Sequence, residues 1–342
     1  MHQDIKGCVK PRTNNIFEKA KKNSEEIAKK AAEFIDEFVE AKRCNLDGLC
    51  FAATGSVGRK EALEASDLDL IPIASNDKVL ADWEPDDAEL RENLRTHLSI
   101  KVSNGEDLTK ACSLPSLIDP KKIGGEKDNS SELTKRVLLL TESISAGGKM
   151  PIAEVRTKLL NAYGEEDRTS GRHVLSLCND VARYYKTLCI EYIPRANDPE
   201  KDWSTRNIKL RHSRKFWYFS NIMVVSMLAS KHPHGDQAFK DALLTAFSKP
   251  PAERLADAIM ESQPLGLGCL LDTYGHFLDF MSSNDNRAAL AKVSHEDRYK
   301  MNLENPFPMM KFNSDLLHSE IMAILEEVGI SVRSRVISWF ML

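Results

Sequence analysis

Hydrophobic and polar residues follow two periods along this chain, and each period predicts a different kind of element. A long amphipathic helix is predicted by apolar residues that recur every three or four positions, at Ile27, Ala31, Phe34 and Phe38. Short, mainly apolar runs at residues 49–53 and 68–73 each predict a buried strand. From Leu133 onward the helical period dominates.

A glycine-rich turn at residues 147–151 separates these two patterns and predicts a domain boundary. We expect residues 1–147 to form an α/β domain of the α+β kind, with a small mixed sheet and the N-terminal amphipathic helix. Residues 148–342 are expected to form an all-α helical domain. Its last helix is expected to have Ser314 as its cap and to close at Gly329.

Composition is that of an ordinary globular protein: 342 residues, of which 42% are hydrophobic and 29% charged. The formal net charge of -4 argues against nonspecific binding to nucleic acid over the whole surface. The seven cysteines form no C-x-x-C pair, and we see no signal peptide or apolar stretch long enough to span a membrane. We therefore expect a cytoplasmic protein without a membrane partner.

The main candidate for chemistry lies between the two predicted strands, where residues 54–61 read T-G-S-V-G-R-K-E. Gly55 and Gly58 allow backbone amides to approach a triphosphate, Ser56 adds a hydroxyl donor, and a helix is expected to begin near Val57. Asp67 and Asp69 follow, two positions apart on the second strand, so their side chains project from the same face. Two adjacent carboxylates suit Mg²⁺, which shares its remaining positions with substrate phosphates.

This combination resembles the DNA polymerase β-like nucleotidyltransferase superfamily, whose signature is a G-S-x-G-R-type turn followed by an acidic pair on the next strand. The G-R-x-E spacing of Gly58, Arg59 and Glu61 is most similar to the bacterial uridylyltransferase group, which modifies a nitrogen-signalling regulator, and to its stand-alone relatives. The chain contains no His-Asp phosphohydrolase motif, so the removing half of the full uridylyltransferase is absent.

The resemblance implies a role for each part of the motif. Gly55 and Ser56 would contact the triphosphate, and Arg59 is counted with this nucleotide-binding turn, which it would brace together with Glu61. Asp67 and Asp69 would be both the catalytic and the metal-binding residues, holding two Mg²⁺ ions, with Mn²⁺ as a substitute. The reaction would transfer a nucleoside monophosphate to a hydroxyl and release pyrophosphate.

The family adds a third carboxylate from a later strand, and this chain departs from that pattern. The expected later strand, residues 98–102, contains no acid. Glu106, Asp107, Glu126 and Asp128 are the candidates, and the sequence does not choose between them. Without a third acid the protein would bind nucleotide and not turn it over, so a non-catalytic nucleotide-binding regulatory subunit is the alternative.

A basic stretch within residues 203–217 is the candidate for binding the triphosphate from the helical half. Lys209, Arg211 and Arg214 are expected to be phosphate contacts, because cations are needed to offset the phosphate charge. The N-x-K element at its centre is similar to a cleft-facing segment of the uridylyltransferase-like group. A solvated basic face and a nucleic-acid-binding patch are the alternatives.

The expected partners follow from this reaction class. The donor would be a nucleoside triphosphate such as ATP. The acceptor would be a protein side chain, a nucleotide or an oligonucleotide, the last as in superfamily members that make signals in antiviral defence. A homo-oligomer and an effector partner both stay open.

Overall fold

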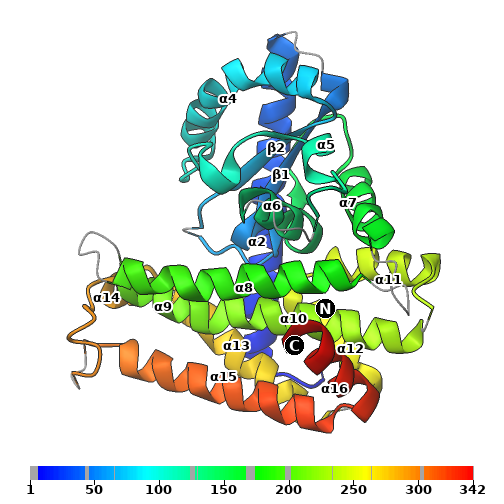
Figure 1. Ribbon diagram of the computed structural model, residues 1–342. Coiled ribbons are helices and arrows are strands. Elements are labelled where there is room, and N and C mark those ends of the chain that lie inside the picture. Colours follow the sequence, from blue (N-terminus) through cyan, green and yellow to red (C-terminus); the bar gives the residue numbers. More distant parts are fainter. Residues whose placement is uncertain are drawn as a thin grey trace. The chain divides into compact units, whose positions relative to one another are not determined.

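The computed structural model of the chain describes residues 7–42, 46–64, 66–123, 128, 130–166, 174–196, 202–232, 234–262, 264–300 and 304–341 (Figure 1). It is a mixed α and β protein with a small sheet and many helices. The chain divides into two compact units. Unit 1 contains Met1–Lys19, Val181–Ser230 and Pro251–Leu342, and unit 2 contains Ala20–Asp180 and Lys231–Pro250.

This division differs from the boundary expected at residue 147. The glycine turn there is part of the sheet edge: the Phe51 amide donates to the Gly147 carbonyl at 3.0 Å, and the Met150 amide donates to the Leu49 carbonyl at 2.9 Å. A β carbon at Gly148 would overlap the Leu49 carbonyl oxygen. The turn residues are therefore packed against a strand of unit 2 and do not form a linker.

Unit 2 contains the sheet and the helices around it. In chain order its elements are the C-terminal part of α2 (Pro11–Ala41), η1 (Leu46–Gly48), β1 (Leu49–Thr54), α3 (Gly55–Gly58), β2 (Asp69–Ala74), α4 (Asp77–Leu98), η2 (Asp107–Thr109), β3 (Cys112–Ser113), α5 (Leu114–Leu117), α6 (Ser130–Thr141), β4 (Ile144–Ser145), α7 (Ile152–Glu166), the start of α8 (Leu175–Ala196), and α11 (Gln237–Phe247). The predicted helix and both predicted strands are confirmed as α2, β1 and β2.

The sheet has four strands in the order β3-β2-β1-β4. β1 is antiparallel to both of its neighbours, and β2 is parallel to β3. The sheet is therefore mixed, as expected.

Alternate residues of β1 face opposite sides of this sheet. Phe51 and Ala53 belong to a hydrophobic core to which α2 and α4 also contribute residues. The rings of Phe51 and Trp83 meet edge-on, with their centroids 5.0 Å apart. Helices α6 and α7 contact the same strand, and burial raises the pKa of the Cys50 thiol. Burial of both faces explains why β1 is an uninterrupted apolar run.

The prediction of a strand at residues 98–102 is wrong. Leu90 and Leu94 continue a helical period into Leu98, so α4 extends through this residue and stops at Ser99, which has a left-handed φ of 53°. Within the region, Val102 alone pairs, as an isolated parallel bridge to Leu68.

Unit 1 is helical. Its elements are the start of α2, most of α8, α9 (Trp203–Lys209), η3 (Leu210–Arg214), α10 (Lys215–Lys231), α12 (Pro251–Ile259), η4 (Met260–Ser262), α13 (Leu267–Ser282), α14 (Asn284–Ala291), α15 (Phe307–Glu327), α16 (Ile330–Val336) and η5 (Ile337–Met341). α15 begins at Phe307, so Ser314 lies inside the helix and is not its cap. Its hydroxyl donates to the Lys311 carbonyl at 2.7 Å. Gly329 does follow the helix, as expected.

Candidate functional site

Strand register brings the glycine turn and the acidic pair together. Thr54, the last residue of β1, lies opposite Asp69, the first residue of β2. The Thr54 hydroxyl also donates to the Asp69 carbonyl at 3.3 Å. Because β1 and β2 are antiparallel, the turn that leaves one strand starts where the acids enter the other. The two halves of the motif therefore lie next to each other within unit 2.

Steric contacts require glycine at both Gly55 and Gly58 of this turn. Gly55 has φ +65°, and a β carbon there would lie 2.6 Å from Oδ2 of Asp69. A β carbon at Gly58 would overlap the Glu142 carbonyl oxygen and lie 2.8 Å from that of Ala53. Gly55 thus gives space to the carboxylate, and Gly58 lets three backbone segments approach closely.

The helix expected near Val57 is a single turn, α3, of four residues. Lys60 follows with a left-handed φ of 59°, and the Glu61 amide donates to the Ser56 carbonyl at 2.8 Å. Such a short helix has little macrodipole, so any phosphate contact here depends on backbone amides and on the half-buried Ser56 hydroxyl.

Arg59 is buried and holds the turn in place. Its Nε donates to Oε2 of Glu61 at 2.9 Å, and its Nη1 pairs with Oε2 of Glu142. All three side chains are at most 6% exposed. The guanidinium is thus bonded to two carboxylates, which fits the expected bracing role and leaves little of it for a phosphate contact. Glu142 was not identified from the sequence, because it lies 83 residues from Arg59.

The acidic pair lies at the entrance to β2. The Asp67 side chain is 54% exposed, and Asp69 is partly buried. Beside them, the Leu68 amide donates to the Lys101 carbonyl at 2.8 Å, and the Ser103 amide donates to the Leu68 carbonyl at 3.0 Å. This pairing brings Lys101 Nζ to 3.8 Å from Asp67 Oδ2. A cation therefore stands next to the acids, on the segment that was expected to be the later strand and that contains no acid.

The structure separates the four candidates for the third acid. Asp128 is buried and paired with Arg136, so it belongs to a buried cluster and not to the site. Glu106 is exposed and its carboxylate accepts from the side-chain Nδ2 of Asn104 at 2.8 Å, and Asp107 is the first residue of η2. Glu126 lies outside the described residues. Among the residues that are described, no three His, Cys, Asp or Glu side chains gather as a metal-binding group.

The basic residues Lys209, Arg211 and Arg214 lie in unit 1, on the continuous helix formed by α9, η3 and α10. η3 is a π-helical turn that contains Arg211 and Arg214, so regular α-helical spacing is interrupted there. Arg211 Nε donates to Asn207 Oδ1 at 2.7 Å. The three cations and the glycine turn are thus parts of different units.

Comparisons with known proteins gave no match: no family model, curated protein or solved structure matches the chain. No helix among the described residues combines the length and the apolar character needed to cross a membrane.

Proposed function

We propose that unit 2 binds a nucleoside triphosphate at the glycine turn and the acidic pair, and transfers its nucleoside monophosphate to a hydroxyl acceptor. The observation that carries this proposal is the register of β1 and β2, which joins Thr54 to Asp69 and so sets Gly55 directly beside a carboxylate. Polyphosphate and divalent cation would need these two elements side by side.

Each residue has a role in this proposal. Backbone amides at Gly55 and Ser56 would orient the phosphates, and the buried Arg59 keeps the turn in one conformation through Glu61 and Glu142. Asp67 and Asp69 are oxygen donors of the kind that Mg²⁺ or Mn²⁺ prefers, so the donor set fits such an ion. When bound, the ion would neutralise phosphate charge and lower the pKa of the attacking hydroxyl. The acceptor would be a protein, a nucleotide or an oligonucleotide.

A second candidate function is favoured by Lys101. Its ammonium lies 3.8 Å from Asp67, and no third acid joins the pair among the described residues. A monovalent cation next to the acids reduces the negative charge available to divalent ions. The alternative is a regulatory subunit that binds nucleotide without turnover.

The test uses purified protein with Mg²⁺ and each ribo- and deoxyribonucleoside triphosphate, following pyrophosphate release and transfer of label. Asp67→Ala/Asp69→Ala is the test variant. Asp82→Ala/Glu84→Ala is a matched control, because it removes two exposed acids at the same spacing from α4 of the same unit.

Release that is lost in the first variant and kept in the second supports the transferase. Nucleotide binding that depends on Asp67 and Asp69 but gives no release, with protein and oligonucleotide acceptors supplied, supports the regulatory subunit. Pyrophosphate release and nucleotide binding that are both unchanged in Asp67→Ala/Asp69→Ala would contradict both functions.

A further inference from the structure

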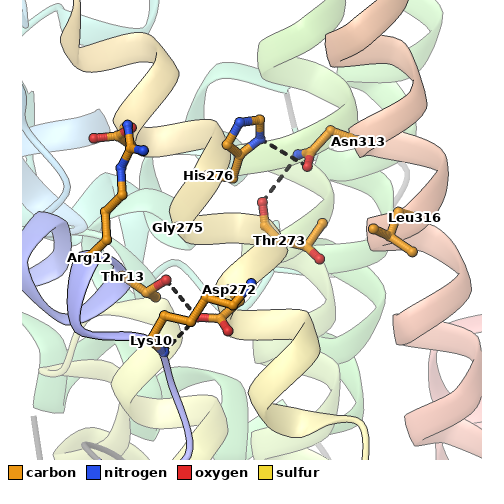
Figure 2. A pocket seen from close by; sticks show the side chains of 10 residues that line it. Lys10, Arg12, Thr13, Asp272, Thr273, Gly275, His276, Asn313 and Leu316 are labelled. Atoms are coloured by element: carbon orange, nitrogen blue, oxygen red, sulfur yellow. Dashed lines mark hydrogen bonds and ion pairs between the residues drawn. The ribbon is translucent and has the colours of Figure 1, made fainter.

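A pocket in unit 1 combines side chains from three elements that are distant in the sequence. Lys10 directly precedes α2, Arg12 and Thr13 come from the first turn of α2, Asp272 and His276 from α13, and Asn313 from α15 (Figure 2). Its volume is about 350 Å³, within the range of small-molecule sites. All of its residues lie in unit 1, so the pocket is independent of the function proposed for unit 2.

A chain of hydrogen bonds determines which nitrogen of His276 carries the proton. It begins at the buried His212, whose Nδ1 lies 2.8 Å from the Ile208 carbonyl oxygen. A carbonyl only accepts, so Nδ1 is the donor. Burial lowers the pKa of His212 to about 3, so this imidazole is neutral and its Nε2 is an acceptor.

The chain continues through Asn313, which is also buried. Its Nδ2 lies 3.1 Å from His212 Nε2 and 3.1 Å from the Thr273 carbonyl oxygen, so the amide nitrogen donates to both. The other end of the amide, Oδ1, must then accept, and His276 Nδ1 lies 3.2 Å from it. Figure 2 shows this pair at one side of the pocket.

The consequence is that His276 Nδ1 is protonated, and its Nε2 is an acceptor when the ring is neutral. Nε2 forms no hydrogen bond within the described part of the chain, and the side chain is exposed. A buried relay is therefore used to orient an exposed imidazole.

Asp272 provides a second acceptor one helical turn away on α13. Its Oδ1 accepts from the Lys10 backbone amide at 3.0 Å and from the Thr13 hydroxyl at 2.6 Å. Thr13 is buried, which holds the carboxylate in one orientation. Oδ2 receives no hydrogen bond from any described residue. The α13 side of the pocket thus presents two oriented acceptors.

Cations lie on the α2 side of the same pocket. The Lys10 ammonium forms no ion pair with a described residue, and Arg12 is paired with Asp279. Acceptors thus come from α13 and positive charge from α2. A metal ion is disfavoured as the occupant, because no three suitable ligands gather in the described residues.

We propose that this pocket binds a small zwitterion of amino-acid size. Its ammonium would donate to Asp272 Oδ2 and His276 Nε2, and its carboxylate would lie toward Lys10 and Arg12. Both ends would form charge-assisted hydrogen bonds, which are stronger than neutral ones. Neither a simple amine nor a simple carboxylate would use both sides.

Binding to the full chain is measured by calorimetry. It is also followed by NMR through the imidazole resonances of His276. The probes are the common α-amino acids, acetate and succinate as carboxylates, and ethylamine and putrescine as amines. We expect at least one amino acid to bind and to shift the His276 signals. Binding should weaken about tenfold or more in Asp272→Asn and in Lys10→Ala. Lys10→Ala keeps the backbone amide that holds Asp272, so it removes only the ammonium.

Asp285→Asn, an exposed change in α14, is the matched control and should leave binding unchanged. Asp67→Ala/Asp69→Ala should also bind normally, which separates this proposal from the function of unit 2. The proposal is overturned if no amino acid binds at millimolar concentration. It is also overturned if amines or carboxylates bind as tightly as the amino acid, or if folded Asp272→Asn and Lys10→Ala proteins bind like the wild type.

Discussion

Lys101 Nζ lies 3.8 Å from Asp67 Oδ2, so an ammonium group stands beside the acidic pair of the candidate site. Backbone pairing of residues 101–103 with Leu68 holds the two segments together. The side chains are 77% and 54% exposed, so water weakens their attraction. The contact between Lys101 and Asp67 should therefore affect cation binding at the site more than the stability of the fold.

Replacing Lys101 by alanine should strengthen divalent-cation binding by a few fold, because about 0.2–1 kcal/mol of competing attraction to Asp67 is removed. Lys101→Glu should strengthen binding further. Mn²⁺ binding followed by electron paramagnetic resonance checks this, with exposed Lys121→Ala as the control. Weaker Mn²⁺ binding in Lys101→Ala would contradict the interpretation.

Gly58→Ala should destabilise unit 2 by about 1–3 kcal/mol or more, because the added β carbon meets backbone atoms of Glu142 and Ala53 that cannot move independently. Gly329→Ala is the matched control. A β carbon there meets nothing within 4 Å, and the change should cost less than about 1 kcal/mol. Denaturant unfolding of both variants gives the comparison, and equal losses would show that Gly58 is not tightly packed.

Arg59→Lys should lower stability by about 3–5 kcal/mol, because lysine cannot bond to both Glu61 and Glu142 and a buried carboxylate loses its partner. Unfolding and nucleotide affinity should be measured on the same samples. A bracing role predicts a large loss of stability, whereas a phosphate contact predicts weaker nucleotide binding with stability unchanged.

His212 should make unit 1 less stable as the pH falls below about 6.5. Burial, together with the charges of Lys215 and Arg211, lowers its pKa to about 3 in the folded state. Between these values the unfolded chain binds a proton that the folded chain excludes, so stability rises with pH. This one site should cost about 2 kcal/mol between pH 7 and pH 5.

The measurement is the free energy of unfolding at both pH values for the wild type, His212→Asn and exposed His318→Asn. The His212 variant should show a smaller pH dependence than the other two. Imidazole ¹⁵N shifts provide an independent check, because His212 and His276 should both carry their proton on Nδ1. A neutral ring that carries its single proton on Nε2, in either histidine, would contradict the relay.

Local patterns were sufficient for the elements that carry the candidate site. The apolar runs of β1 and β2 and the amphipathic period of α2 were predicted because each reports burial of one segment on its own faces. The glycines were also informative, since Gly55 and Gly58 are required by close approach of other atoms. Arg59 and Glu61 are two positions apart in the sequence, so their mutual contact could be predicted from the motif.

Contacts between distant segments decided the rest. Glu142 is the second carboxylate that binds Arg59. Asp128 pairs with Arg136 in a buried cluster and is therefore not a candidate metal ligand. Lys101 lies close to the acids only because its segment pairs with Leu68. The two units combine noncontiguous segments, because α11 returns to α6 and α7 of unit 2 while the start of α2 packs in unit 1. Amphipathic periodicity shows that a surface is buried but not which partner buries it, so these relationships appear only in the folded chain.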